Sequence, residues 1–443
     1  MIFKNWDRIR KINLLIVSKL LRWFFATGFL LFFISFFVEC ETYRQVQVTS
    51  HNKNFAYLYN PVSSTFYAQY YVFSPSDIKT EIFIRIPRRE LAFTTKNNEV
   101  VRKAFIAMQY KVKHLPENSF VVDSGSLILE IPDTNKLFVE FPLLIKTITY
   151  KHFFVTLDIK DISSGNKVSD FLTIDKTSPY NSQSFKVLGK DNNLLYDFQV
   201  HPESKIRVQY RNQEVKRFYV KYFSPSNRIA GVPFFSQNSN MSEFNEDTIF
   251  SINKDTLISI DKQGIYFIQA DTLQEEGVSI FCFSKDFPAI KTPSAMLGPL
   301  RYLTSKKEFQ QFSNYQNKKI AVDEFWLKAG GNIARGKELI KVFYNRVVLA
   351  NIYFSSFKEG WMTDRGMIYI VFGPPKYVFR SPNAEKWIYG DIKNPQSLAF
   401  VFELVHNPFS TKHFILKRTD YYKNIWYQGV TTWRSGRAYV IGG

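Results

Sequence analysis

Cysteine and histidine are scarce in this chain of 443 residues. The two cysteines, Cys40 and Cys282, are too few to form a framework of disulfides. The six histidines stand alone, and His406 and His413, seven residues apart, have no adjacent cysteine or carboxylate at metal-ligand spacing. Cys282 lies within an apolar strand-like run, where a buried, inert thiol is expected. We therefore predict no metal site, and nothing in the sequence indicates a cofactor.

Motifs of the common enzyme classes are also missing. The sequence contains no Gly-x-Ser-x-Gly elbow, no His-Glu-x-x-His helix and no glycine-rich phosphate loop. A glycosidase needs only two carboxylates that face one cleft, and no short motif marks such a pair. The sequence therefore favours a protein without catalytic residues, while glycan or peptide hydrolysis stays open as an alternative.

Negative charge is low, because 39 Asp and Glu residues stand against 58 Lys and Arg residues, a net charge of +19. An excess of this size favours attraction to anionic surfaces. The basic residues are scattered and form no nucleic-acid-binding motif, so nucleic acid is not an expected partner. A carrier of a lipid or an acidic ligand is a further alternative.

Aromatic residues are abundant, with 44 Phe and 25 Tyr, and they account for most of the 17% aromatic content. Enrichment of this kind favours β-strands over helices. Charged residues are only 22% of the chain, which argues against long disordered stretches. The composition thus predicts well-packed, mainly β domains.

The first 40 residues are typical of an export segment. A basic stretch precedes an apolar run from Phe24 to Val38, as in a secretory signal. Cys40 follows, where a bacterial lipoprotein is cleaved and lipidated, although Glu39 occupies a position that is normally small. Lipidation of Cys40, an uncleaved anchor and simple secretion are the three interpretations. The run is shorter than the roughly 20 residues of a spanning helix. Each interpretation places the folded part in the cell envelope, in the periplasm or at the outer membrane.

Two β-rich regions follow the export segment. Within residues 153–160, one apolar set at every second position alternates with Phe154, Thr156, Asp158 and Lys160, which is the pattern of a half-buried strand. Several such runs separated by turn residues predict an immunoglobulin-like β-sandwich over residues 41–185. A second, smaller β-sandwich is predicted over residues 186–295, with a hairpin that pairs residues 258–260 with residues 265–267.

The pattern changes after a proline-rich boundary near residue 298. Residues 305–315 and 334–357 are predicted helices, and the longer one carries an apolar stripe with spacings of three and four. Gly360 is expected to end that helix. Met367–Phe372 is then a predicted strand that Gly373, Pro374 and Pro375 terminate. We predict a helix-plus-sheet domain over residues 298–443.

This C-terminal region carries a series of motifs in a fixed order. They are Phe325-Trp326, Tyr344-Asn345-Arg346-Val347, Ala350-Asn351, Phe354, Gly360-Trp361-Met362-Thr363-Asp364-Arg365-Gly366, Ile368-Tyr369-Ile370, Gly373-Pro374-Pro375 and Glu385-Lys386-Trp387-Ile388-Tyr389-Gly390. The series closely resembles the GWxTD-domain family of exported Bacteroidota proteins. The resemblance covers about a third of the chain. It implies an envelope location and an architecture, but no particular reaction.

The run from Gly360 to Gly366 is most simply a structural corner between the long helix and the following strand. Trp361 suits an apolar plug with one N–H donor, and Thr363 and Asp364 suit acceptors of backbone N–H groups. Arg365 is expected to pair with a carboxylate, and the candidates are Asp364, Glu359 and Glu385. Gly366 would free the backbone to enter the strand, and Pro374, Pro375 and Trp387 would cap its far end.

The alternative is that Thr363, Asp364 and Arg365 line a ligand cleft. Asp364 would then act as an acid or base with Glu359 or Glu385 in an envelope glycan or peptide hydrolase. The favoured hypothesis is a membrane-anchored, non-catalytic binding or scaffolding protein. In it, two β-sandwiches space the C-terminal domain from the membrane, and that domain binds a protein or glycan partner.

Overall fold

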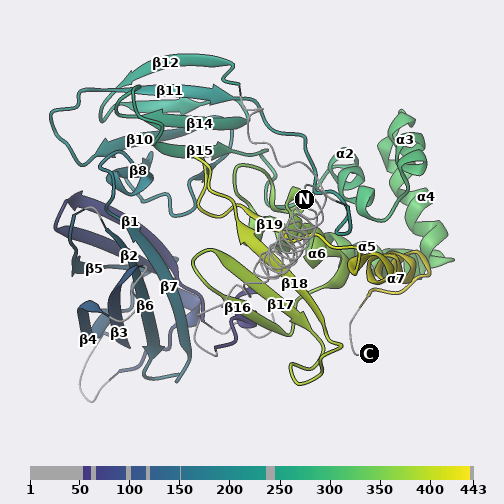
Figure 1. The fold of residues 1–443 in the computed structure, drawn as a ribbon, viewed down its shortest axis with the longest axis horizontal. Coiled ribbons are helices and arrows are strands. Elements are labelled where there is room, and N and C mark those ends of the chain that lie inside the picture. Colours follow the sequence, from purple (N-terminus) through teal and green to yellow (C-terminus); the bar gives the residue numbers. More distant parts are fainter. Residues whose placement is uncertain are drawn as a thin grey trace, which may run out of the picture. The chain divides into compact units, whose positions relative to one another are not determined.

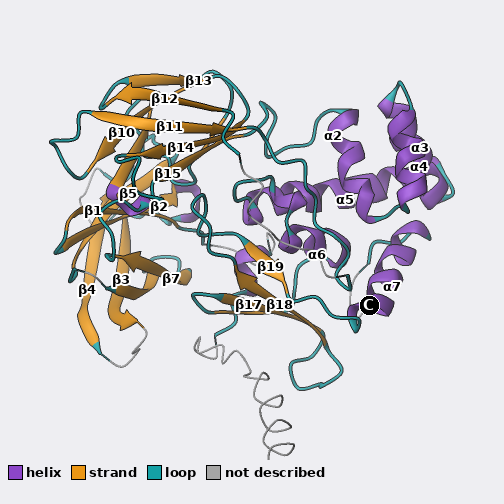
Figure 2. Cartoon of the chain, turned by 45° about the horizontal axis from the view of Figure 1, so that its top comes forward, coloured by secondary structure: helices purple, strands orange, loops and turns teal. Residues whose placement is uncertain are grey.

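The computed structural model describes residues 53–60, 66–95, 101–115, 120–149, 151–235 and 245–439. Cys40 and the apolar run before it lie outside these residues. Antiparallel sheets form the N-terminal part of the described chain, and helices with a small sheet form the C-terminal part (Figures 1 and 2). The expected fold class, mainly β with a C-terminal α+β domain, is confirmed. Within the described ranges, no helix combines the length and apolarity needed to cross a bilayer.

The first β region contains two sheets whose apolar faces share one core. Fully buried side chains include Ile82 and Ile84 from one sheet and Val155 and Leu157 from the other. The alternation predicted for residues 153–160 is confirmed in β6. The strand orders are β1 (Gln69–Ser76)–β2 (Lys79–Pro87)–β5 (Phe138–Lys146) and β4 (Val121–Pro132)–β3 (Lys103–Leu115)–β6 (His152–Asp161)–β7 (Lys167–Asp175).

The second β region again contains two sheets around a separate core. Their orders are β13 (Leu257–Ile260)–β10 (Ser204–Tyr210)–β8 (Phe185–Gly189) and β12 (Thr248–Asn253)–β11 (Arg217–Phe223)–β14 (Gly264–Gln269)–β15 (Val278–Cys282)–β9 (Gln199–Val200). Cys282 is a buried free thiol, and burial, with a smaller effect of Asp261, raises its pKa to about 11. An inert thiol is what the sequence predicts.

The predicted hairpin between residues 258–260 and 265–267 is wrong. Ile258 pairs with Ile206 on β10, whereas Ile265 pairs with Phe223 and Phe281. The two strands therefore belong to opposite sheets of the sandwich. Alternation alone indicates a strand at each position, but it does not specify which neighbour the strand pairs with.

The C-terminal domain, residues 298–439 of the described chain, combines helices with a four-stranded sheet. Its elements, with the short helix that precedes it, are α2 (Pro293–Leu297), η4 (Gly298–Tyr302), α3 (Lys306–Asn314), α4 (Lys318–Gly330), α5 (Ile333–Phe354), η5 (Gly360–Met362), α6 (Asp364–Phe372), β16 (Tyr377–Arg380), β17 (Ala384–Tyr389), β18 (Leu398–Leu404), β19 (Phe414–Leu416) and α7 (Tyr422–Arg434). The helices predicted over residues 305–315 and 334–357 are confirmed as α3 and α5. The apolar stripe on α5 from Leu339 to Phe354 is buried. α5 packs against α6 (Figure 1).

The strand predicted at Met367–Phe372 is wrong, because these residues lie in α6. Every residue of α6 is buried, so its apolar run shows no helical stripe. Periodicity cannot distinguish such a run from a buried strand. The helix is instead specified at its ends, where Thr363 forms the N-cap and Gly373, with a φ of 83°, forms the C-cap.

Candidate functional site

The motif loop from Gly360 to Gly366 packs directly against α5. Gly360 does not end that helix as predicted, because α5 already stops at Phe354. Instead, a Cβ atom on Gly360 would overlap the carbonyl oxygen of Ala350, and one on Gly366 would overlap the carbonyl oxygen of Gly360. Both glycines are therefore required for close approach of backbones, and the predicted role of Gly366 in entering a strand is also wrong.

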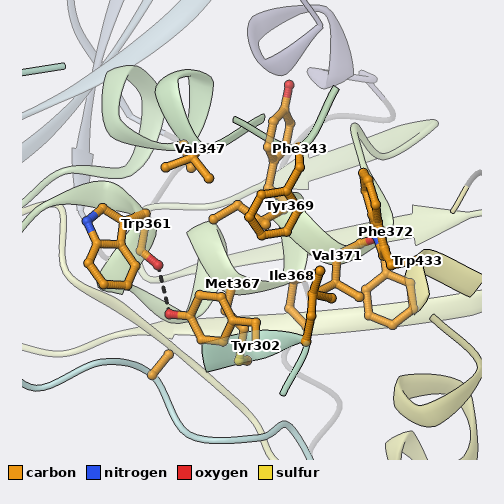
Figure 3. Close-up of a cluster of buried hydrophobic side chains, with 14 of the residues drawn as sticks. Tyr302, Phe343, Val347, Trp361, Met367, Ile368, Tyr369, Val371, Phe372 and Trp433 are labelled. Atoms are coloured by element: carbon orange, nitrogen blue, oxygen red, sulfur yellow. Dashed lines mark hydrogen bonds between the residues drawn. The ribbon is translucent and has the colours of Figure 1, made fainter. Parts of the chain in front are cut away.

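Side chains on α5 and near its end fix the start of this loop. Asn351 accepts the N–H of Trp361 at 3.0 Å, and Ser355 accepts the N–H of Gly360 at 2.8 Å. The indole N–H of Trp361 donates to Glu359 at 2.7 Å. The hydroxyl of Tyr302 donates to the Trp361 carbonyl at 2.7 Å (Figure 3). Trp361 thus fills the apolar role that the sequence predicts.

Thr363 joins the loop to α6. Its hydroxyl donates to the Gly360 carbonyl at 2.7 Å and accepts the N–H of Gly366 at 3.0 Å. This is an N-cap that also bonds back to the preceding turn. Met367, Ile368 and Val371 then continue into the core drawn in Figure 3. The predicted structural corner is present, but it joins two helices.

Asp364 is buried, with 6% of its surface exposed, and its carboxylate is fully engaged. It accepts the N–H of Leu416 on β19 at 2.7 Å, and it accepts two bonds from Arg418 at 2.6 and 2.8 Å. The two-pronged contact with Arg418 ties α6 to the residue after β19. The sequence does not identify Arg418 as a partner, because 54 residues separate the pair and no motif surrounds the arginine.

Glu385 is the centre of a second buried cluster, with 1% of its surface exposed. Arg365 and Arg380 each donate to its Oε1 at 3.2 Å, Tyr59 donates to the same oxygen at 2.8 Å, and Trp387 donates to Oε2 at 3.1 Å. Burial alone would raise the pKa of Glu385, but the two guanidinium groups outweigh burial and lower it. Glu385 is therefore the ionised partner of Arg365, one of the three candidates predicted.

The other end of α6 is held by Arg346. Its guanidinium donates to the carbonyls of Ile370 and Val371, each at 3.2 Å, and to that of Tyr439 at 2.9 Å. A cation at this end complements the helix dipole. The hydroxyl of Tyr389 donates to the Gly373 carbonyl at 2.8 Å. Pro374 and Pro375 thus follow the end of a helix, rather than the end of a strand as predicted.

A segment far away in the sequence completes this domain. Asn54 lies along the edge of β16, where its side chain accepts the N–H of Val378 at 2.9 Å and donates to the Lys376 carbonyl at 3.0 Å. The N–H of Phe55 donates to the Val378 carbonyl at 2.8 Å. The short helix η1 (Ala56–Tyr59) follows, and the Tyr59 carbonyl accepts a bond from Tyr369 on α6 at 2.8 Å.

The same segment, residues 54–59, also contacts the first β region. The Tyr57 hydroxyl donates to the Ser169 carbonyl on β7, and the ring of Phe55 packs edge-on against Phe171. Arg380 pairs with Asp170 on β7 at 3.0 Å. We call residues 54–59 the clamp. The sequence gives no sign of it, because the clamp is short and its contacts in the C-terminal domain lie more than 300 residues away.

Replacing Tyr59 by phenylalanine tests the clamp. The ring contacts with Phe354 and Trp387 would remain, but Glu385 would lose one of its donors. We expect a loss of about 1–2 kcal/mol in the free energy of unfolding, measured by urea denaturation. The exposed Tyr427 provides the control, because Tyr427→Phe should leave stability unchanged. Equal stability of both variants would contradict this role of the clamp.

One other cluster has the residue types of a catalytic site. Ser356 Oγ lies 3.4 Å from His413 Nδ1, and Lys358 and Glu359 are close in sequence. Burial, with Lys358 and Arg365, lowers the pKa of His413 to about 3, so its imidazole is a weak base. Ser356 is itself buried. This pair therefore lacks both the basicity and the access that a nucleophile needs.

The hydrolase alternative required Asp364 with Glu359 or Glu385 in an open cleft. Asp364 and Glu385 are instead buried and saturated by internal donors, and Glu359 accepts from Trp361. Burial raises the pKa of Glu359, an effect that the bond from Trp361 reduces. No group of three potential metal ligands is found in the described ranges. The carboxylates are therefore used to build the domain.

Three comparisons with known proteins bear on the family of this chain, and a family model matches the C-terminal region. A glycosyl hydrolase family 2 member from Bacteroides cellulosilyticus DSM 14838 is similar in structure over 30% of this chain, at 10% identity and a TM-score of 0.19. The match spans 17% of that protein's chain. No curated protein matches the sequence. The family model described as the GWxTD domain matches residues 264–435. The chain thus contains a GWxTD domain over residues 264–435.

Proposed function

We propose that this protein is a membrane-anchored, non-catalytic component of the cell envelope, whose GWxTD domain binds or organises a protein or glycan partner. The use of the motif's charged groups carries the proposal. Arg365 pairs with Glu385, whereas Asp364 binds a neighbouring arginine and a backbone N–H group. A motif used in this way builds a rigid platform, and the partner is then recognised by the surface.

The clamp is the first described segment after the proposed anchor along the chain. Chain leaving Cys40 reaches Asn54 after 14 residues, which span at most about 50 Å when fully extended. Asn54 is already bound to β16, before the first sandwich begins. Along the chain, the clamp therefore lies between Cys40 and the first sandwich, and we propose that the GWxTD domain is tethered through the clamp, in place of the spacer arrangement predicted from the sequence.

Labelling with radioactive palmitate tests the anchor. We expect the wild-type chain to incorporate label and to fractionate with membranes, because Cys40 follows a basic and apolar export segment. Cys40→Ala should lose the label. Cys282→Ala is the matched control and should keep it, because Cys282 is buried in β15. Label that survives in Cys40→Ala would exclude lipidation at this cysteine.

Partner binding is tested by crosslinking in intact envelopes, followed by recovery of the chain. Ile320 and Leu327 are exposed and seven residues apart on α4, so they lie on one side of that helix. The double variant Ile320→Glu/Leu327→Glu alters the GWxTD surface. Ile128→Glu/Leu144→Glu alters the first sandwich in the same way. We expect partner recovery to fall only in the first variant. Recovery of no specific partner by the wild-type chain would count against the proposal.

A further inference from the structure

A pocket of about 910 Å³ lies beside α5 in the GWxTD domain. Its walls include the apolar side chains of Leu339, Val342, Val348 and Leu349. Pockets for small ligands typically measure about 300–1,000 Å³ and combine apolar walls with few polar groups. This pocket is separate from the Asp364 and Glu385 clusters, neither of which lines it.

The charged groups of the pocket are mainly cationic. Arg335, Lys341 and Arg346 line it against one carboxylate, Glu338. Arg335 and Glu338 pair with each other at 2.6 Å, so their charges largely cancel. Lys341 and Arg346 have no ion-pair partner among the described residues. The pocket therefore has an excess of positive charge.

Arg346 is the more unusual of these two cations. Its side chain is buried, and its partners are the neutral carbonyls of Ile370, Val371 and Tyr439. Its guanidinium also lies 5.2 Å from the centre of the Trp433 ring, but no carboxylate pairs with it among the described residues, and burial lowers its pKa to about 10. Buried charges are normally paired, so an anion in this pocket would supply the missing partner. Lys341, at the exposed side, would supply a second contact.

We infer that the pocket binds a small molecule with one anionic group, such as a carboxylate, and an apolar body. The anionic group would lie toward Arg346 and Lys341, and the apolar body would lie against Val342, Val348 and Leu349. This inference does not depend on the proposed anchor or on a macromolecular partner. It places the acidic-ligand alternative in the GWxTD domain.

The test uses the full chain in phosphatidylcholine nanodiscs, with empty nanodiscs as the blank. The probe is 4-(trifluoromethyl)benzoate, observed by ¹⁹F NMR line broadening. The neutral 4-(trifluoromethyl)benzyl alcohol keeps the apolar body without the charge. We expect the benzoate to bind saturably and at least about tenfold more tightly than the alcohol, because only the anion can form charge-assisted bonds.

Variants on one helix locate the binding. Lys341→Glu and Val342→Glu place a negative charge at the pocket, and each should weaken benzoate binding by about tenfold or more. Ile352→Glu is the matched control, because Ile352 is exposed on α5 but does not line the pocket, and its affinity should stay at the wild-type value. These rim positions avoid Arg346, which also caps α6. Equal binding of benzoate and alcohol, or equal binding by all three variants and wild type, would overturn the inference.

Discussion

Glu385→Gln is expected to lower the free energy of unfolding of the GWxTD domain by about 3–5 kcal/mol, the usual cost of removing one charge from a buried ion pair. Glutamine has nearly the same shape as glutamate, so the change removes charge while creating no cavity. Arg365 and Arg380 would then share an uncharged acceptor in a site from which water is excluded. Arg380 would keep Asp170, but Arg365 has no second carboxylate within ion-pair distance among the described residues.

Tryptophan fluorescence during urea denaturation is a selective measurement of this effect. Five of the seven tryptophans lie in the GWxTD domain, at positions 326, 361, 387, 426 and 433, and the other two, Trp6 and Trp23, precede Cys40, so neither sandwich contains one. Their signal therefore follows this domain apart from the two sandwiches, which matters because a chain with several domains need not unfold in one step. Glu338→Gln is the control, since it breaks an exposed pair on α5 worth less than about 1 kcal/mol.

The same variant should change the response to acid. The pKa of Glu385 is lower in the folded chain than its ordinary value of 4.5. A group of this kind stabilises the fold above its unfolded pKa, and that stabilisation is lost as the pH falls through the folded pKa. Wild-type stability should therefore decline more steeply than that of Glu385→Gln below the ordinary glutamate range. Parallel curves for the two proteins would contradict an ionised Glu385.

Gly360→Ala is expected to cost more than about 3 kcal/mol, or to prevent folding of the GWxTD domain. The added methyl group would overlap the carbonyl oxygen of Ala350, a backbone atom of α5. No rotamer change relieves such an overlap, so α5 and the motif loop would have to separate. That separation would also break the bonds from Gly360 to Ser355 and from Trp361 to Asn351.

Gly189→Ala is the matched control for this substitution. Gly189 lies in β8, and the nearest atoms to an added methyl group are 3.8 Å away, an ordinary contact. Its effect should stay within about 1 kcal/mol. Thermal melts of the two variants, followed by circular dichroism so that both the sandwiches and the GWxTD domain contribute to the signal, provide the comparison. A Gly360→Ala protein that melts with the wild type would show that close packing at this glycine does not hold the motif loop.

The periodicity of the sequence predicted the elements that expose one face to solvent. The α5 stripe and the β6 alternation were found correctly, because a half-buried element needs apolar residues at regular intervals. Periodicity does not identify α6 as a helix, because both sides of this element are buried and no interval distinguishes a helix from a strand. It also failed to identify the sheet of β13, because strand pairing depends on the rest of the sandwich.

The residues of the motif show the same division. Local chemistry was sufficient to predict that Trp361 is a plug, that Thr363 binds backbone groups and that Arg365 needs a carboxylate. The identity of that carboxylate, and the pairing of Asp364 with Arg418, depended on how strands and helices pack. Two carboxylates that resembled an acid and a base in the sequence are acceptors inside two separate buried clusters.

By itself, the sequence determined the order of β and helical regions and the residue types at the corner, because these follow from local composition and spacing. Its ordered motifs indicated the domain family through their resemblance to it. The tertiary structure alone decided that residues 54–59 complete the GWxTD domain and that Glu385 has four donors. It also decided that Arg346 lines a pocket and has neutral partners instead of a carboxylate. These features join residues distant in the sequence, and only the folded chain brings their charges and hydrogen-bonding groups within a few ångströms.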